Sequence, residues 1–293
     1  MPAQTDPLSV PRPSAALQYT ALFLAVALAF LGNGLQGTLT GIRASQEGLS
    51  SLAIGLIMSS FFLGYFAGSI VAPRLIQQVG HIRAFAALAS IASGVTLAFP
   101  IFISPGAWIL FRLIGGACFA GMLIVVESWL NAGSASAVRG RVLAAYNLVV
   151  YVAWGVSQQL LNLAPAADFT LFCVVSILFS VSLVPITLSR AGQPGVVKAD
   201  RSALRRLAEV SPTAVAGTFC LGAAMAAFWG MAPSWGEGQG LSERTLSVFL
   251  SIVLAGALAL QWPLGWLSDF VDRRLVLTVT LLAGAGVATA LFF

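Results

Sequence analysis

Charged side chains are scarce in this chain of 293 residues, where Asp, Glu, Lys and Arg together make up 9%. Soluble domains carry roughly 25% charged residues, which keep their surfaces hydrated. Hydrophobic residues, by contrast, make up 58% of the chain, and the mean hydropathy is +0.93. The shortage of charge therefore excludes a soluble globular domain and indicates a membrane protein.

Residues that build disulfides, metal sites and catalytic centres are also few. The three cysteines, Cys118, Cys173 and Cys220, lie in apolar segments, where cysteine packs as a small hydrophobe. The one histidine, His81, has no second His or Cys near it in sequence that could share a metal. The acids form no cluster at one depth, and no ATP-binding P-loop pattern is present. We predict no disulfide, no metal site, no cofactor and no enzymatic activity.

Two glycine patterns are interpreted as packing motifs. "GNGLQG" (32–37) fits the dinucleotide-binding pattern, but it lies inside an apolar stretch and lacks a preceding strand. "GYFAG" (64–68) is of the small-xxx-small type, which lets membrane helices approach closely. We expect both patterns to serve helix packing.

Long apolar runs are what the sequence has in abundance. About nine stretches of roughly 18 or more residues are each long enough to cross the ~30 Å hydrocarbon core as a helix. These runs lack the alternation that is typical of a membrane β-barrel strand. The sequence therefore predicts an all-α polytopic membrane protein with spans at 18–42, 51–73, 84–103, 107–131, 142–163, 169–189, 213–235, 245–267 and 275–293.

Two polar segments divide the chain. Residues 1–16 are polar and Pro-rich and are predicted to form a disordered cytoplasmic tail. Residues 190–212 combine Gly, Pro and a basic run, which indicates a cytoplasmic linker. Six predicted spans precede this linker in an N-terminal half (17–189), and three follow it in a partial C-terminal half (213–293).

Basic residues concentrate on one side of the predicted membrane. With the N-terminus inside, the outer loops hold only Arg43 and Arg244. An excess of Lys and Arg marks the cytoplasmic side, so the N-terminus is predicted to be cytoplasmic. The net charge of +5 thus reports membrane topology and gives no sign of nucleic-acid binding. The inner face collects Arg12, Arg74, Arg83, Arg139, Arg141, Arg190, Lys198, Arg201, Arg205, Arg206, Arg273 and Arg274.

An internal repeat relates the two halves. A shift of 192 positions lays the first three predicted spans on the last three, and it aligns "PRLIQQVGHIR" (73–83) with "GWLSDFVDRRL" (265–275). Repeats of this kind are a feature of secondary transporters. The offset indicates two related halves, the second of which holds three spans.

The two aligned loops resemble the Gly-x-Leu-x-Asp-Arg-x-Gly-Arg-Lys signature of the major facilitator superfamily. The second copy has Asp272 where the family has Gly, and the first has Pro73 and Gln77 at the leading Gly and the Asp. The signature residues kept in the second copy are Gly265, Leu267, Asp269, Arg273 and Arg274. Those kept in the first copy are Leu75, Gly80 and Arg83.

Other stretches extend the resemblance to the whole chain from residue 18. Arg112, Gly115 and Gly116 resemble an Arg-x-x-Gln-Gly-type run that the family carries in its fourth helix. "VVESWLNAGSASAVRGRVLAAYNLV" and "LQWPLGWLSDFVDRRLVL" are similar to a bacterial branch of the family called YcaD-like. The chain is thus identified as a member of this branch of the major facilitator superfamily.

The resemblance implies a fold and a function. The family has two six-helix halves around a cavity lined by helices 1, 4, 7 and 10, so by this comparison we expect the last three helices to be missing. It implies secondary active transport of a small solute by alternating access in the bacterial inner membrane, by a monomer when complete. The family's usual coupling ion is a proton, although no carboxylate is expected at mid-membrane in the predicted spans.

Three alternatives to this function stay open. One is a transporter homologue that acts as a sensor, and one is a truncated, inactive or partner-dependent transporter fragment. The third is a multidrug efflux antiporter, which is less favoured because Gly155 lacks the following Pro of the antiporter signature.

Arg112 and Glu127 are charges within the predicted span 107–131. Fifteen residues separate them, about 22 Å along a helix, so they cannot pair with each other. We expect Arg112 to face the translocation cavity, where it would bind an anionic group or influence a proton step. The alternative is an interfacial arginine that snorkels to the headgroups.

For Glu127 we expect a cytoplasmic gate, closed by pairing with loop arginines at the inner end of the span. The alternative is a solvated helix-end charge, worth about 0–1 kcal/mol in a surface pair. The expected gate residues besides Glu127 are Arg83, Arg139 and Arg141 in the first half and Asp269, Arg273 and Arg274 in the second.

Polar and aromatic residues at helical spacing mark three further spans. Such stripes either contact a solute or hydrogen-bond between helices, for about 0.6 kcal/mol each. The sequence leaves both possibilities open. The candidates for the cavity, besides Arg112, are Asn33 and Gln36 in 18–42, Tyr151 and Gln158 in 142–163, and Trp229 in 213–235.

Overall fold

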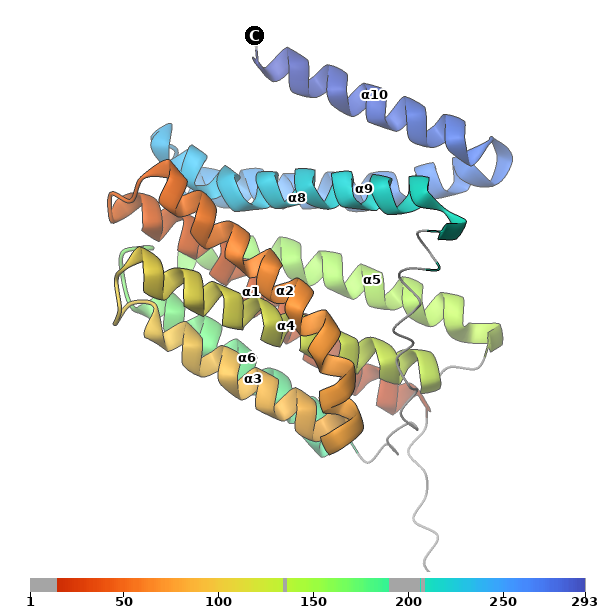
Figure 1. Ribbon diagram of the computed structural model, residues 1–293, viewed down its shortest axis with the longest axis horizontal. Helices are drawn as coiled ribbons and strands as arrows, with labels where there is room; N and C mark the ends of the chain where they lie inside the picture. Colours follow the sequence, from red (N-terminus) through yellow and green to blue (C-terminus); the bar gives the residue numbers. More distant parts are fainter. Residues whose placement is uncertain (1–14, 134–135, 190–205, 207–208, 293) are drawn as a thin grey trace, which may run out of the picture.

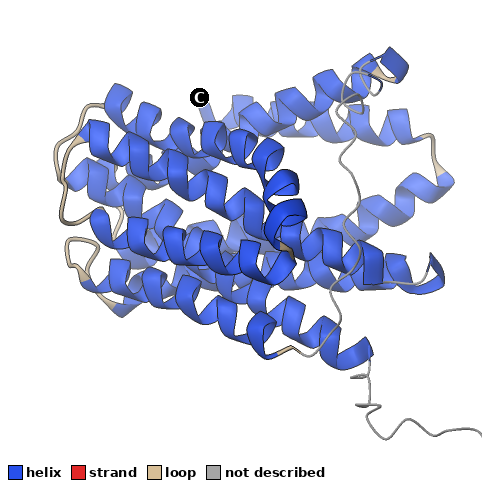
Figure 2. Ribbon diagram, turned by 60° about the horizontal axis from the view of Figure 1, so that its bottom comes forward, coloured by secondary structure: helices blue, strands red, loops and turns tan. Residues whose placement is uncertain are grey.

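The computed structural model describes residues 15–133, 136–189, 206 and 209–292. The regular structure of these residues is helical, as Figure 2 shows, and the helices are joined by short loops. Most of the predicted tail (1–16) and linker (190–212) lies outside the described residues. The helices are α1 (Ala15–Gln46), α2 (Ser51–Val79), α3 (His81–Ala98), α4 (Pro105–Gly133), α5 (Ser136–Gln159), the 3-10 helix η1 (Leu160–Leu163), α6 (Thr170–Leu188), α8 (Pro212–Gly238), α9 (Glu243–Phe270) and α10 (Arg273–Phe292).

Seven of these helices are long and apolar enough to cross a membrane: α1, α2, α3, α4, α6, α8 and α9. The helices of the other two predicted spans, α5 and α10, do not meet this criterion over their described residues. The first turns of α5 carry Arg139 and Arg141, which lower its apolar character. Nevertheless α5 packs against α1 on one side and α9 on the other, so it belongs to the same bundle.

The predicted span ends differ most from the observed helix ends in two places. The span expected over 84–103 begins earlier, at His81, and ends at Ala98. The following turn contains Pro100, which has no N–H to continue a helix, and α4 begins at Pro105. The span expected over 142–163 is α5 followed by the tighter 3-10 turn of η1.

The helices fall into a tightly packed group and a looser layer (Figure 1). The N-terminal group consists of α1 to α6, in which α2 packs on α4, α1 on α6, and α3 on both α4 and α6. On one side of this group lie α8, which packs on α1 and α2, and α9, which packs on α5. Beyond them α10 contacts α9 (Figure 1). The two groups meet along α1, α2 and α5.

Two turns that lie 192 positions apart have the same geometry, as the internal repeat predicts. The α1–α2 turn has Gly48 at φ 70° and the α8–α9 turn has Gly240 at φ 73°, values that favour glycine. The hydroxyl of Ser50 then caps α2 and that of Ser242 caps α9, with backbone angles that agree within a few degrees. Equivalent turns at equivalent positions indicate that both halves share one local fold.

Glycines bring α2 and α4 together. A Cβ at Gly64 would lie 2.7 Å from the carbonyl carbon of Leu113, and a Cβ at Gly68 would lie 2.6 Å from the Cα of Ala117. From the other helix, a Cβ at Gly116 would lie 2.9 Å from the carbonyl carbon of Phe61. These distances leave no room for any side chain. The prediction that "GYFAG" serves close helix packing is confirmed.

The "GNGLQG" segment of α1 also serves packing. Gly32 faces α6, where a Cβ would contact Leu178 at 3.4 Å, and Gly34 faces α5, where a Cβ would lie 2.8 Å from the Trp154 ring. Gly37 has nothing within 4 Å, and it borders the cavity described next.

Candidate functional site

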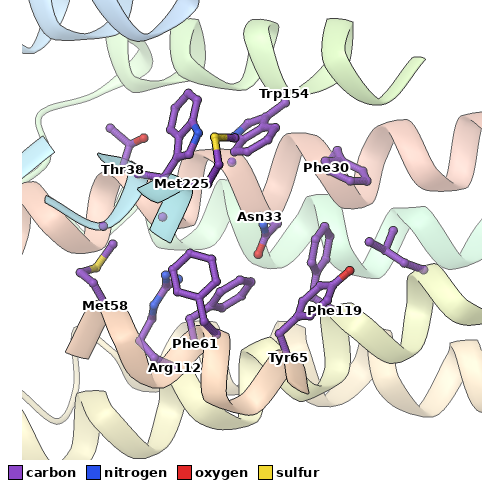
Figure 3. Close-up of a pocket in the computed structure, with 16 residues that line it drawn as sticks. Phe30, Asn33, Thr38, Met58, Phe61, Tyr65, Arg112, Phe119, Trp154 and Met225 are labelled. Atoms are coloured by element: carbon purple, nitrogen blue, oxygen red, sulfur yellow. The ribbon is translucent and has the colours of Figure 1, made fainter. Parts of the chain in front are cut away.

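A cavity of about 270 Å³ lies where the N-terminal group faces α8 (Figure 3). Its walls come from α1, α2, α4, α5 and α8, so it is shared between the two groups of helices. We call it the Arg112 cavity, after the one charged residue among those that line it. The lining residues are Phe30, Asn33, Gly34, Gly37, Thr38, Met58, Phe61, Phe62, Tyr65, Arg112, Phe119, Leu123, Trp154, Met225, Trp229 and Gly230.

Arg112 is buried in the cavity wall, with 4% of its surface exposed. Its guanidinium carbon lies over the Phe61 ring, 4.4 Å from the ring centroid, which is a cation–π contact. Figure 3 shows the two neighbouring side chains. Gly116, one turn along α4, permits this contact because it lets α2 approach at Phe61. Among the described residues Arg112 has no ion pair, and its Nε has no hydrogen-bond partner. The site thus holds a buried cation without a counter-ion.

Aromatic rings form most of the remaining wall. Phe119 lies edge-on to Phe30 with centroids 5.1 Å apart and is 6.3 Å from Phe61. On the opposite side, the Trp154 ring of α5 packs on the Trp229 ring of α8 with centroids 4.6 Å apart. Figure 3 shows Trp154 and Met225 across the cavity from Arg112 and Phe61. The cavity is therefore an aromatic box that both groups of helices close.

A few polar groups interrupt these apolar walls. Asn33 reaches into the cavity from α1, and Tyr65 contributes its hydroxyl from α2 (Figure 3). Thr38 lines the cavity while its hydroxyl donates to Oε1 of Gln158 at 2.6 Å. None of the lining residues is acidic.

Three of the six predicted cavity residues line this cavity, namely Arg112, Asn33 and Trp229. Gln36 instead faces α3, where its Nε2 donates to Oγ1 of Thr96 at 3.0 Å in the buried interior. Gln158 lies behind the wall as the acceptor for Thr38, and Tyr151 lies outside the lining set. A step of three residues turns a helical side chain by about 60°, enough to move Gln36 from the cavity to a neighbouring helix.

Helix α2 contributes cavity residues that the sequence did not point to. Met58, Phe61 and Tyr65 recur at a spacing of three to four residues and line the cavity. Phe66 of the same helix is 58% exposed on the outer surface of the bundle, whereas Phe61 is 8% exposed. Both are phenylalanines in an apolar helix, so hydropathy alone could not tell which of them faces the cavity. The close packing of "GYFAG" was the available clue to which face is inside.

Glu127 has a partner other than the predicted arginines. The Tyr146 hydroxyl of α5 donates to its Oε1 at 2.9 Å. Arg83, Arg139 and Arg141, all within the described residues, are exposed and form no ion pair with Glu127. Arg141 leaves α5 on another face than Tyr146, and Arg139 lies about two helical turns before Tyr146. An arginine gate at Glu127 is absent from this conformation and stays a prediction for another one.

The predicted gate residues of the second half are likewise apart. Asp269 is exposed near the end of α9, and Arg273 and Arg274 are exposed at the start of α10. Asp272, which occupies the family's Gly position, accepts the backbone N–H of Arg274 at 2.8 Å and so caps α10. Asp272 therefore departs from the family signature but has a local role as the cap of α10.

A second cavity of about 540 Å³ separates α5 from α9 at the end of the bundle where α2 joins α3. Asn147 of α5 borders it, together with Gln261 and Asp269 of α9. We call it the α5–α9 cavity. It leaves the two helices apart at the end that collects Arg83, Arg139, Arg141, Arg273 and Arg274.

At the opposite end the same two helices are held together by hydrogen bonds. Gln159 donates to Oγ of Ser251 at 2.6 Å, and Asn162 of η1 donates to Oγ of Ser247 at 3.0 Å. We call these four residues the α5–α9 clasp. Between α5 and α9 the described hydrogen bonds all lie at this end, so the halves are closed there and separated at the other.

Two carboxylates add to this closure. Oε1 of Glu243 accepts the backbone N–H of Ala166 at 2.9 Å, joining the start of α9 to the α5–α6 loop. Oε1 of Glu237 accepts from Nε2 of Gln46 at 3.3 Å, joining α8 to α1. The nearby Arg43 of α1 pairs with Glu47, the residue that follows the end of this helix, at 2.6 Å.

Within the part of the chain that the structure describes, no three His, Cys, Asp or Glu side chains gather as metal ligands would. The chemistry that the geometry offers is binding: a shielded aromatic space with one unpaired cation, at the junction of two helix groups. Such a space suits the recognition of a small molecule.

Comparison with known proteins agrees with a transporter architecture. The chain is 25% identical to the uncharacterized MFS-type transporter Ent638_1421 of Enterobacter sp. (strain 638), over 96% of this chain and 75% of the relative. The same identity and coverage relate it to the uncharacterized MFS-type transporter YcaD of Escherichia coli (strain 55989 / EAEC). The fold is similar to the crystal structure of a mutant of the nucleoside transporter NupG, with a TM-score of 0.69 at 12% identity over 86% of this chain and 68% of that one. The family whose profile the sequence matches, over residues 22–293, is the Major Facilitator Superfamily, and the chain belongs to it.

Proposed function

We propose that this membrane transporter moves a small solute by alternating access and binds it in the Arg112 cavity. The observation that supports this most is the contrast between the two ends of the α5–α9 pair. One end is joined by the α5–α9 clasp, and the other is separated by the α5–α9 cavity. In alternating access, one repeat rocks against the other around a fixed central site. The arrangement corresponds to one end state of that motion.

The sidedness of this end state follows from the positive charges. The open end carries most of the described arginines, and the closed end carries Arg43 and Arg244. Under the rule that Lys and Arg accumulate on the cytoplasmic side, the state is closed outward and open inward. The N-terminus is then cytoplasmic, and the membrane is the inner membrane that the family resemblance implies.

Proton coupling is part of the proposal, on the basis of the family resemblance. Glu127 is the carboxylate that the described structure holds between α4 and α5, through Tyr146. Its half-buried position allows it to act as a gate or as a proton site. A multidrug antiporter for cationic drugs is less well supported, because the cavity presents a cation and no carboxylate.

The proposal is tested by labelling that needs no known substrate. In a background without Cys118, Cys173 and Cys220, an Asn33→Cys variant places a thiol in the cavity wall. An impermeant maleimide should label it from the cytoplasmic side. Adding Gln159→Ala and Ser247→Ala, which remove clasp hydrogen bonds, should raise labelling from the outer side about fivefold, since bonds of about 0.5–1 kcal/mol each are lost.

A matched control replaces the exposed Asn147 and Gln261 of the α5–α9 cavity with alanine. These residues make no contact that closes the outer end, so outer labelling should stay as it was. Equal outer labelling with and without the clasp would contradict alternating access between the halves.

Glu127→Gln is expected to change the balance between the two states while keeping an oxygen that accepts from Tyr146. Loss of one half-buried charge should alter maleimide labelling of Asn147→Cys, in the α5–α9 cavity, about two- to fivefold. Tyr146→Phe serves as the control that removes only the hydrogen bond and should have the smaller effect. Unchanged labelling in Glu127→Gln would leave Glu127 as a solvated charge without a gating role.

A further inference from the structure

We infer that the Arg112 cavity binds a small organic anion with a single negative charge and a planar ring, of which an aromatic carboxylate is the simplest case. The inference deepens the proposed function and rests on it for its physiological meaning. The binding itself is independent of transport and is tested separately.

The charge of the ligand follows from the state of Arg112. Arg112 is 4% exposed, its guanidinium contacts the Phe61 ring, and it has no ion pair among the described residues. A buried charge without a partner is strongly unfavourable. Since no lining residue is acidic, the missing negative charge is supplied by the ligand. One guanidinium without a second lining cation matches one negative charge.

The geometry of the guanidinium favours a carboxylate. Arginine presents its N–H groups as a rigid planar fork that binds both oxygens of a carboxylate at once. The Arg112 guanidinium carbon lies over the Phe61 ring, so the ligand would meet N–H groups that the ring does not cover. An orientation with the carboxylate toward α4 places the rest of the ligand between the aromatic walls.

The walls favour a flat, apolar body. Phe119 and Phe61 stand on one side, and the packed pair of Trp154 and Trp229 stands on the other. Aromatic rings stack or meet edge to face, with an added gain beyond the buried area. The volume of about 270 Å³ is at the small end for ligand pockets, which suits one or two rings.

Two polar groups allow limited decoration of the ring. The Asn33 amide and the Tyr65 hydroxyl border the cavity and have no hydrogen-bond partner in the part of the chain that is described. A hydroxyl on the ring would satisfy one of them. A ligand with a hydroxyl group is therefore expected to bind at least as tightly as its unsubstituted parent.

The test measures binding to the purified full chain in nanodiscs, in chloride-free buffer, by quenching of tryptophan fluorescence and by calorimetry. The probes are benzoate, its neutral isostere benzamide, the cation benzylammonium and the ringless acid acetate. Benzoate should bind at least about tenfold more tightly than benzamide and acetate, and benzylammonium should not bind. The comparison between probes uses the unmodified protein, so its result stays valid even if a variant fails to fold.

Variants then assign the effect to the site. Arg112→Gln should lower benzoate affinity at least about tenfold and leave benzamide unchanged, and Arg112→Lys should fall between. The matched control, Arg83→Gln, removes an exposed arginine outside the cavity and should change neither. Equal affinities for benzoate and benzamide, full benzoate affinity in Arg112→Gln, or no benzoate binding at millimolar concentration would each overturn the inference.

Failure of the inference and failure of the proposed function give different results. Benzoate binding that depends on Arg112, without uptake of labelled benzoate into proteoliposomes, would retain the ligand class and count against transport. Clasp-dependent labelling from both sides without benzoate binding would retain alternating access and remove the ligand class.

Discussion

Arg112→Gln is expected to abolish transport and, at the same time, to leave the empty protein as stable as before or more stable. Truncating one partner of a buried charge pair typically costs about 2–5 kcal/mol in binding, which is roughly 30-fold to several thousand-fold in affinity. In the empty cavity, however, Arg112 is itself an unpaired buried charge. Its removal relieves a desolvation penalty, offset in part by the loss of a cation–π contact worth about 2 kcal/mol.

The two measurements are uptake of labelled benzoate into proteoliposomes and the thermal midpoint of the empty protein. We expect uptake at background level and a midpoint that is unchanged or raised by a few degrees. A structural arginine would behave in the opposite way, because its loss would lower the midpoint and reduce activity in proportion. Full uptake in the variant would remove Arg112 from the mechanism.

Gly116→Ala is expected to destabilise the fold strongly, although it adds only one methyl group. The added Cβ would lie 2.9 Å from the carbonyl carbon of Phe61 and 3.0 Å from the backbone nitrogen of Tyr65, so α2 would have to move away. Overpacking in a rigid interior costs about 1–3 kcal/mol, and here the obstacle is backbone. The shift would also carry Phe61 off the Arg112 guanidinium.

The adjacent Gly115 supplies a matched control. A Cβ at Gly115 meets nothing within 4 Å, and alanine is the better helix former. Gly115→Ala should therefore keep or slightly raise the thermal midpoint and the yield of monodisperse protein, whereas Gly116→Ala should lower both. The same effect in the two variants would show that α2 and α4 do not depend on close contact.

Much of the fold was predictable because the bilayer restricts what a chain can do. The helical class and approximate positions of the spans followed from apolar run length, since backbone polar groups in lipid must be satisfied within helices. The repeat was visible in two loops at an offset of 192, and the Gly48 and Gly240 turns match at that same offset. The observed helix ends differ from the predicted ones where a local residue stops the helix, as Pro100 does after α3.

The site was predictable only where a residue stood out against its surroundings. Arg112 is a charge in an apolar run, and it lines the cavity. The polar Gln36 and Gln158 stood out equally well, yet they hydrogen-bond to Thr96 and Thr38. A polar residue in a membrane helix satisfies either a ligand or another helix, and sequence alone does not distinguish these outcomes.

The sequence by itself determined that the chain is a helical membrane protein, approximately where its helices lie, that two of its loops repeat, and that one cation lies within the fourth span. Only the tertiary structure decided which faces of the helices turn inward. Lipid and the cavity wall both accept apolar side chains, so Phe61 and Phe66 look alike in sequence although one contacts Arg112 and the other is exposed. The rotation of each helix about its axis is set by contacts such as those of Gly64, Gly68 and Gly116, which exist only once the helices have packed.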